Sequence, residues 1–317
     1  MEPYNKVPTL NSAFPFSESE DAEALRKAMK GMGTDEKAII NIIAKRPNYQ
    51  RQLIGEAYKQ AFEKNLLDDL KSELGGHFED VMLALMTPMS VYLAKAIQEA
   101  LKKKHNNTLI EILCTRDKQS IESIKKSYME HGKELPADLN RGGPSLKFYQ
   151  FLIAMITEVR SDVTDDTQLA KYLSQKLSDA VKGKAGKPIE VAVMEILTKY
   201  SYPMLRMAFK EFSNIQNDKF ESIIDSQFPD ELKGVMKTVY ESITSPAVFF
   251  AKELNSAIAG VGTDDPKLIR LVVSRCEIDM GDIKVEYEKL YKESLEKAIK
   301  GDTSKYYKKA LLALIES

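Results

Sequence analysis

One helical segment recurs four times along the 317-residue chain, and this repetition limits what the chain can fold into. The apolar stretch IIAKR, which ends at Arg46, has counterparts that end at Arg116 (ILCTR), Tyr200 (ILTKY) and Arg275 (VVSR). Their offsets from the first copy are 70, 154 and 229. Apolar residues within the copies follow helical spacing, and β-branched alternation is rare. We therefore predict an all-α protein made of four copies of one helical unit.

The repeat positions also predict how the chain is divided. We expect an N-terminal tail over residues 1–17, followed by repeats over 18–87, 88–160, 161–244 and 245–317. Residues 157–168 (TEVRSDVTDDTQ) are polar and lack helical apolar spacing, so we expect them to link two halves of the chain.

Composition excludes several classes of protein. The chain has 46 Lys and Arg against 47 Asp and Glu, a formal net charge of −1, which argues against a constitutive nucleic-acid binder. Permanent electrostatic attachment to a membrane needs clustered basic residues, and the run Lys102–His105 is short. No apolar run is long enough for a transmembrane helix, and the first residues do not resemble a signal peptide. We expect Cys114 and Cys276 to be reduced thiols in a cytoplasmic protein.

Two glycine loops occur at equivalent places in the first and fourth repeats. Gly31 and Gly33, within MKGMGTDE, correspond to Gly260 and Gly262, within AIAGVGTDD. An acidic residue follows the second glycine of each loop at an identical separation: Glu73 in the first repeat and Asp302 in the fourth. Each loop is thus coupled to one carboxylate.

This pairing of a glycine loop with an acid suits calcium, which binds six to eight oxygen ligands, including backbone carbonyls and carboxylates. Glycines at positive φ can direct successive carbonyls to one point. The expected ligands are the carbonyls of Met29, Gly31 and Gly33 with the Glu73 side chain, and the carbonyls of Ile258, Gly260 and Gly262 with the Asp302 side chain. Candidates for minor sites are Thr34, Glu36, Thr263 and Asp265.

The simpler alternative is that each loop only turns the chain, with Thr34 capping the next helix. The second and third repeats argue against it, because they lose the glycines and the acid together. The glycine positions become Leu101 and Lys103 in one and Ala185 and Lys187 in the other, and the acid positions become Gly143 and Gln227. If the third repeat is aligned with a small shift, its loop contains Gly183 and Gly186, but Gln227 at the acid position still carries no charge.

These motifs resemble those of the annexin family. The first repeat, LRKAMKGMGTDEKAI followed by DDLKSELGG, and the fourth, GTDD followed by LIRLVVSRCEID and IKGDTSKYYKKALL, are close to annexin repeats, and the resemblance covers about residues 18–317. It implies four five-helix repeats packed as a curved disc, with calcium loops on the convex face. It also implies calcium-dependent binding to acidic phospholipids and a role in membrane organisation, trafficking or repair.

The second and third repeats depart from the family pattern, so two calcium loops are expected. One carboxylate per loop leaves calcium under-coordinated, and a lipid phosphoryl oxygen can complete the shell. Calcium and lipid then raise each other's affinity. Lys30 either attracts lipid phosphate through its charge or is simply a solvated loop residue. Self-association on membranes is a further expectation. The N-terminal tail is not clearly amphipathic, so the sequence does not decide whether it binds a protein partner.

Other functions explain fewer of these features. A helical-repeat scaffold that binds protein partners explains four helical units but not the paired loops and acids. No EF-hand loop is present. His77, His105 and His131 have no matched catalytic partners, and KGKAGKP at residues 182–188 lacks the Walker spacing, so we expect no enzymatic activity.

One polar position is shared by all four repeats. Asn41, Glu111, Glu195 and Arg270 each lie five residues before the repeated anchor, within an apolar helix. Buried charges require partners or water. We therefore predict that Glu111 and Arg270, in the second and fourth repeats, line a polar central channel. That channel is either a structural polar core or a weak cation pathway.

Overall fold

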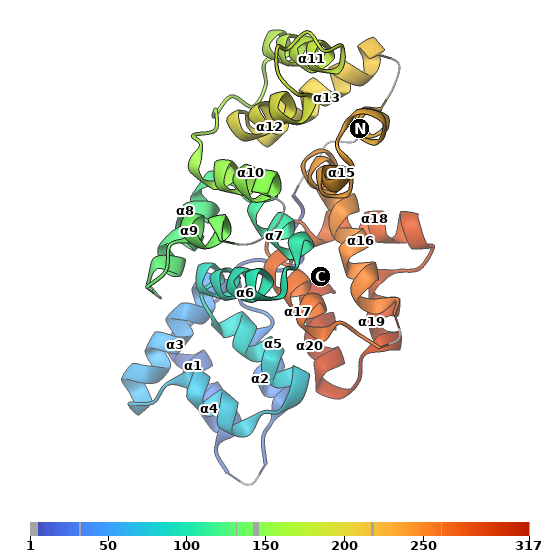
Figure 1. Cartoon of the computed structure of the whole chain (residues 1–317). Helices are drawn as coiled ribbons and strands as arrows, with labels where there is room; N and C mark the ends of the chain where they lie inside the picture. Colours follow the sequence, from blue (N-terminus) through green and yellow to red (C-terminus); the bar gives the residue numbers. More distant parts are fainter. Residues whose placement is uncertain are drawn as a thin grey trace. The chain divides into compact units, whose positions relative to one another are not determined.

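The computed structural model describes residues 6–31, 33–130, 132–141, 146–216, 219–260 and 262–316. Across these ranges the chain forms twenty α-helices and no strand (Figure 1). This confirms the predicted all-α class. His131 and Gly143, which entered the sequence arguments, lie outside the described residues.

The first two groups of five helices occupy the N-terminal half of the chain. The first group comprises α1 (Glu18–Met29), α2 (Glu36–Ile43), α3 (Asn48–Phe62), α4 (Leu66–Glu73) and α5 (Gly76–Met86). The second comprises α6 (Met89–Lys103), α7 (Asn106–Leu113), α8 (Lys118–Met129), α9 (Leu135–Asn140) and α10 (Leu146–Thr157).

The remaining two groups follow in the C-terminal half. The third comprises α11 (Thr167–Val181), α12 (Ile189–Lys199), α13 (Tyr202–Gln216), α14 (Phe220–Gln227) and α15 (Asp230–Thr244). The fourth comprises α16 (Pro246–Ile258), α17 (Asp265–Arg275), α18 (Met280–Tyr291), α19 (Leu295–Asp302) and α20 (Lys305–Ile315).

Helix boundaries recur at the offsets found in the sequence. Helices α2, α7 and α17 begin at Glu36, Asn106 and Asp265, so their starts keep the offsets of 70 and 229. The short fourth helix ends at Glu73, Gln227 and Asp302 in the first, third and fourth groups, at offsets of 154 and 229. The chain therefore consists of four repeats of five helices, as predicted. The predicted repeat bounds, 18–87, 88–160, 161–244 and 245–317, remain predictions.

The helices form two compact units. Unit 1 is Leu93–Phe249, and unit 2 combines the described residues of Glu2–Tyr92 with those of Phe250–Ser317. Residues 157–168, which we expected to link two halves, connect α10 to α11 inside unit 1. The expectation was wrong because the second and third repeats pack into one unit, so the boundaries between units fall within α6 and α16 instead.

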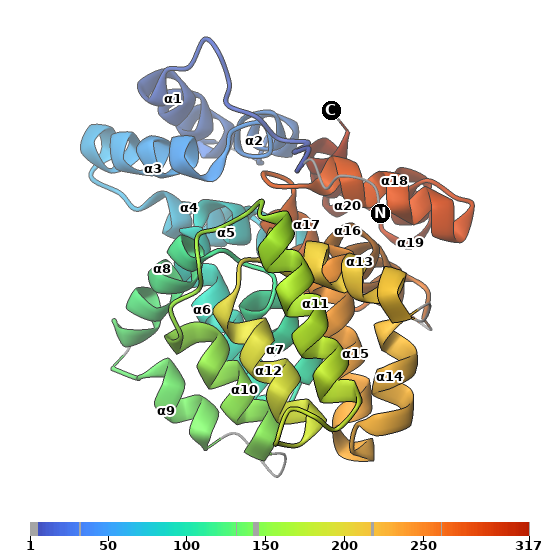
Figure 2. The same ribbon diagram turned by 90° about the horizontal axis from the view of Figure 1, so that it is seen from above.

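The core of unit 1 is formed by apolar faces of the second and third repeats. Helix α11 packs along α13, and α15 contacts α7 (Figures 1 and 2). Phe209, Phe220 and Tyr240 form an aromatic cluster with ring centroids 4.9–5.7 Å apart. Helix α10 contacts both α7 and α12, so it joins the second repeat to the third.

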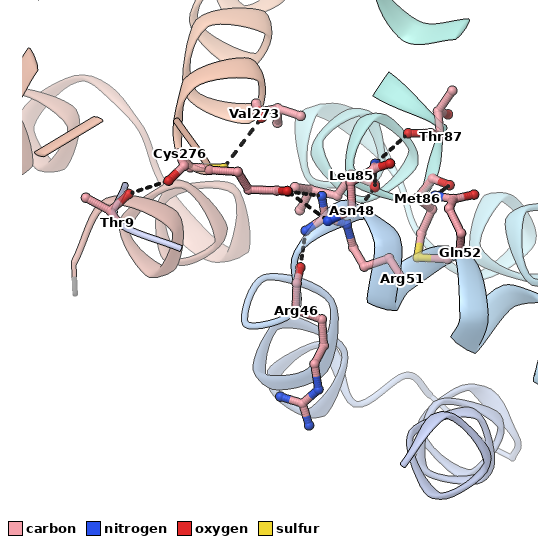
Figure 3. Close-up of polar contacts among 11 residues, drawn as sticks. Thr9, Arg46, Asn48, Arg51, Gln52, Leu85, Met86, Thr87, Val273 and Cys276 are labelled. Carbon is pink, nitrogen blue, oxygen red and sulfur yellow. Dashed lines mark hydrogen bonds and ion pairs between the residues drawn. The ribbon is translucent and has the colours of Figure 1, made fainter. Parts of the chain in front are cut away.

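In unit 2, a buried arginine joins the first repeat to the fourth. Arg51, in α3, is fully buried. Its guanidinium donates to the Leu85 carbonyl at 2.7 Å (Figure 3). It also donates to the Glu277 carboxylate at 2.8 Å. The Asn48 backbone N–H donates to the same carboxylate at 2.9 Å. Burial lowers the pKa of Arg51, and the Glu277 charge opposes this effect. A buried charge requires such a partner, and this ion pair joins α3 of the first repeat to the fourth repeat.

The residues before α1 lie against the fourth repeat. The Val7 carbonyl accepts from the Gly281 N–H at 2.8 Å, and the Thr9 N–H donates to the Cys276 carbonyl at 2.8 Å. A Cβ on Gly281 would lie 2.8 Å from Val7 Cγ1 and 2.9 Å from its carbonyl oxygen. Glycine is therefore required at 281 because the N-terminal segment passes so close to α18.

Replacing Gly281 with alanine tests this close contact. Alanine normally favours a helix over glycine by about 1 kcal/mol. Here the added methyl group would push Val7 away from α18, so we expect Gly281→Ala to destabilise the protein by about 1–3 kcal/mol. Thermal unfolding followed by circular dichroism measures this effect.

The matched control is Gly234→Ala. Gly234 also lies within a helix, α15, and a Cβ there would meet no atom within 4 Å. This substitution should leave stability unchanged or raise it by up to about 1 kcal/mol. Equal melting temperatures for the two variants would show that the N-terminal segment does not approach Gly281 as described.

Candidate functional site

The first glycine loop joins α1 to α2. Gly31 and Gly33 have φ angles of 126° and 91°, which L side chains rarely adopt. The carboxylate of Asp35 accepts from the Ala38 N–H at 3.0 Å and caps α2. Asp35, and not Thr34, is therefore the helix cap, which leaves the Thr34 hydroxyl for another partner.

The Thr34 hydroxyl meets the acid expected from the sequence. Its Oγ1 donates to Glu73 Oε2 at 3.1 Å, and Glu73 is the last residue of α4. The Glu73 side chain is exposed and borders a cavity of about 290 Å³ between the starts of α5 and α20. The fold thus holds a carboxylate against a left-handed glycine loop and leaves it accessible to a cation.

The fourth repeat has the same arrangement. Its loop joins α16 to α17, and Asp264 caps α17 by accepting from the Lys267 N–H at 3.1 Å. The Thr263 hydroxyl donates to the carboxylate of Asp302, the last residue of α19. The two loops belong to opposite ends of the sequence, yet they use the same cap and the same threonine–acid contact.

The glycines of the fourth loop differ from expectation in one respect. Gly262 has a φ of 86°, but Gly260 does not lie in the left-handed region. A Cβ on Gly260 would lie 3.5 Å from the Gly262 carbonyl oxygen, an ordinary van der Waals distance. The expectation that Gly260 has positive φ was wrong, because the turn at this loop is made at Gly262.

The other candidate ligands occupy three kinds of environment. The side chains of Met29 and Ile258 are buried, so only their carbonyls are candidates. Glu36 lines the cavity beside Glu73. Asp265 already has a partner, since its carboxylate lies 3.1 Å from His77 Nε2. Asp265 is thus a weaker candidate for a minor cation site than Glu36.

The donor set of these loops fits calcium better than it fits a transition metal. Among the described residues, no group of three or more His, Cys, Asp or Glu side chains is arranged to hold a metal ion. Glycine carbonyls and one carboxylate are hard oxygen donors, which calcium prefers. Zinc is normally held by several nitrogen and sulfur ligands. The residues present are therefore compatible with calcium, and their assignment as its ligands remains a prediction.

The second and third repeats have no such pairing. In the third, Gly183 and Gly186 have φ angles of 70° and 68°, so this loop keeps two left-handed glycines. Gln227 ends α14 as Glu73 ends α4, but it is an uncharged amide. The second repeat has Lys102–His105 in place of the loop glycines.

The four matched polar positions lie in different environments. Glu111 is buried and Arg270 is half-buried, whereas Asn41 and Glu195 are exposed. Glu195 pairs with Lys187 at 2.8 Å. Because Glu111 and Arg270 belong to different units, the polar channel shared by them stays a prediction.

The sequence analysis missed a pair of contacts between repeats. In unit 2, His77 in α5 contacts Asp265 in α17. In unit 1, Lys147 in α10 contacts Glu190 in α12 at 3.1 Å. Lys147 occupies in the second repeat the place of His77 in the first, and Glu190 in the third repeat matches Asp265 in the fourth, so the two pairs are equivalent. The repeat offsets show that the two pairs occupy equivalent positions, but they do not show that the residues of each pair are in contact.

Comparisons with known proteins agree with the repeats and the fold. The family model described as Annexin matches residues 20–85, 92–142 and 249–314, which leaves the whole third repeat unmatched. The chain is 41% identical over 319 residues to Annexin B10 of Drosophila melanogaster, covering 99% of each chain.

Solved structures of similar chains have the same fold. The structure named Annexin III superposes with a TM-score of 0.90 at 36% identity, covering 98% of this chain and 97% of that one. The calcium-bound structure of annexin (Sm)1 superposes with a TM-score of 0.89 at 28% identity, covering 98% of this chain and 93% of that one.

The backbone difference between Gly260 and Gly262 gives a test within one loop. Alanine at a left-handed position costs about 1–2 kcal/mol. We therefore expect Gly262→Ala to weaken calcium binding about tenfold, and Gly260→Ala to change it little. Calorimetric calcium titration in a Glu73→Gln background isolates the fourth loop.

Thermal melting of both variants controls for a general loss of structure. An equal effect of the two alanines on calcium affinity would contradict the assignment of the turn to Gly262.

Proposed function

The chain belongs to the annexin family, and from this premise we propose that it binds acidic phospholipid membranes through calcium held at the loops of its first and fourth repeats. Annexins in general bind calcium and phospholipid and are not enzymes, and we propose no catalytic role for this chain. The proposal includes a role in membrane organisation, trafficking or repair.

One observation carries the proposal: the acid lies against the glycine loop in both repeats. Thr34 donates to Glu73, and Thr263 donates to Asp302. Helix α4 or α19 must end beside the loop for this contact to form. Neither loop needs the contact to turn the chain, because Asp35 and Asp264 already cap the following helices. A ligand role for the acids explains why both repeats keep them.

The proposed ligands are the carbonyls of Met29, Gly31 and Gly33 with Glu73, and the carbonyls of Ile258, Gly260 and Gly262 with Asp302. Bound calcium would supply the positive charge that attracts a lipid phosphate. Each loop contributes only one of these carboxylates, so the protein alone offers few charged ligands, and affinity in solution is expected to be low. Lipid oxygens that complete the shell would couple calcium binding to membrane binding.

Lys30 adds a charge at the first loop. It is exposed directly after α1, beside Gly31. A lysine close to an anionic membrane surface contributes about 1 kcal/mol of attraction. The fourth loop has Ala259 at the equivalent position, so we expect this contribution in the first repeat alone.

The proposed location is the cytoplasm, with peripheral attachment to membranes when calcium rises. In the part of the chain that the structure describes, no helix is both long and apolar enough to span a bilayer. Attachment through calcium at surface loops needs no such helix.

Neutralising the two acids tests the proposal. Glu73→Gln and Asp302→Asn should each raise the calcium concentration for half-maximal vesicle binding by roughly tenfold, because affinity depends on ligand charge. The double variant should lose nearly all binding at moderate calcium. Cosedimentation with vesicles of phosphatidylserine and phosphatidylcholine measures this midpoint.

The matched control is the double variant Glu56→Gln, Glu288→Gln. Both residues are exposed on other helices of unit 2, α3 and α18. This control removes the same charge and should keep the wild-type midpoint. If Glu73→Gln, Asp302→Asn also keeps that midpoint, the proposed sites are wrong.

A further inference from the structure

The four equivalent loops differ in charge. Each loop is taken from the last two residues of the repeat's first helix to the residue before its second helix. The formal charge is zero over residues 28–35 and −1 over residues 257–264, the two loops with an acid partner. It is +3 over residues 102–105 and +3 over residues 180–188. The repeats that lack the glycine–acid pairing therefore have basic loops.

Six lysines account for this charge, and all six are exposed. Two of them have ion-pair partners: Lys102 with Glu99, one helical turn earlier, at 2.6 Å, and Lys187 with Glu195 of α12 at 2.8 Å. Within the described ranges the other four form no ion pair: Lys103, Lys104, Lys182 and Lys184. Most of the charge is thus available to an external anion.

The fold of unit 1 brings both loops to the same end of α10. Tyr149, in the first turn of α10, donates to Asn106, the residue directly after the second-repeat loop, at 3.4 Å. Lys147, two residues earlier, pairs at 3.1 Å with Glu190, which follows the third-repeat loop. The start of α10 therefore contacts the first turns of both α7 and α12, the helices that follow the two loops. The two lysine loops, although distant in sequence, thus both precede helices that pack against one end of α10.

We propose that the six lysines of these loops form a lysine surface that binds acidic phospholipid headgroups directly, without calcium: Lys102, Lys103, Lys104, Lys182, Lys184 and Lys187. It rests on the proposed function in that the partner is again an acidic membrane. The second and third repeats would then replace a calcium-bridged contact by lysine–phosphate contacts at equivalent loops.

Charge and composition favour a lipid surface over nucleic acid. Neither loop contains Phe, Tyr or Trp, which single-stranded nucleic acids use for base stacking. The chain as a whole has a net charge of −1, without the basic excess typical of nucleic-acid binders. A membrane surface, in contrast, needs only a local group of lysines.

The proposal predicts binding that depends on salt and not on calcium. Each lysine close to an anionic surface strengthens binding about fivefold. Exposed charges are screened beyond about 3 Å in 1 M salt but only beyond about 30 Å in 0.01 M salt. Binding in the presence of a calcium chelator should therefore be clear at low salt and lost at high salt.

The test is cosedimentation with phosphatidylserine-containing vesicles in a calcium chelator at low salt. The triple variant Lys103→Gln, Lys182→Gln, Lys184→Gln removes three lysines that lack ion pairs. It should bind roughly 100-fold more weakly than the wild type. Vesicles of phosphatidylcholine alone should bind neither protein.

The matched control is Lys118→Gln, Lys126→Gln, Lys210→Gln. These lysines are exposed on α8 and α13 of the same unit, and the change in charge is identical. The control should bind almost as the wild type does. Equal weakening of both triple variants would overturn the proposal, because net charge alone would then explain binding.

The chelator separates this proposal from the calcium sites. Glu73→Gln, Asp302→Asn should bind in chelator as the wild type does. If that double variant also keeps its calcium-dependent binding to vesicles, the assignment of the calcium sites is wrong, but the proposal of a lysine surface is unaffected. If the wild type does not bind acidic vesicles in chelator at low salt, the proposal of a lysine surface is wrong, whether or not binding occurs with calcium.

Discussion

The contact between a loop threonine and a distant carboxylate is the constraint on which the candidate sites depend. Thr34 and Glu73 are 39 residues apart, as are Thr263 and Asp302. Each contact forms only because the short fourth helix of the repeat ends beside the loop that follows the first helix. Helix packing thus places the carboxylate beside the loop. The glycines with positive φ let the loop backbone adopt a conformation that other residues disfavour.

Each unit pairs two repeats through side-chain contacts at equivalent positions. His77 and Asp265 join the first repeat to the fourth in unit 2, and Lys147 and Glu190 join the second to the third in unit 1. The same packing therefore surrounds loops of different chemistry: glycines with an acid in unit 2, and lysines in unit 1. This difference between otherwise equivalent repeats is the basis for the two modes of membrane contact that we propose.

The sequence predicted features that depend on local pattern, and it failed where neighbours decide. Apolar periodicity was sufficient to predict the helices. The repeat offsets were sufficient to predict that Glu73 and Asp302 are each coupled to a glycine loop. A Gly-x-Gly motif does not say which glycine has positive φ, so the positive φ expected for Gly260 was wrong. Glu195 was grouped with buried Glu111, but it is exposed, because helix packing decides which face is covered. The partner of His77 lies in another repeat, and only helix packing shows that α7 and α12, which follow the two lysine loops, both contact α10.

A crystal structure determined with calcium would test the central claim most directly. It should contain one calcium ion at each of the two glycine loops, about 2.3–2.6 Å from the carbonyl oxygens of Gly31 and Gly33 and from the Glu73 carboxylate, with the equivalent ligands in the fourth repeat. The loops at 102–105 and 182–188 should hold none. Calcium bound at those basic loops, or at neither glycine loop at saturating concentration, would contradict the account.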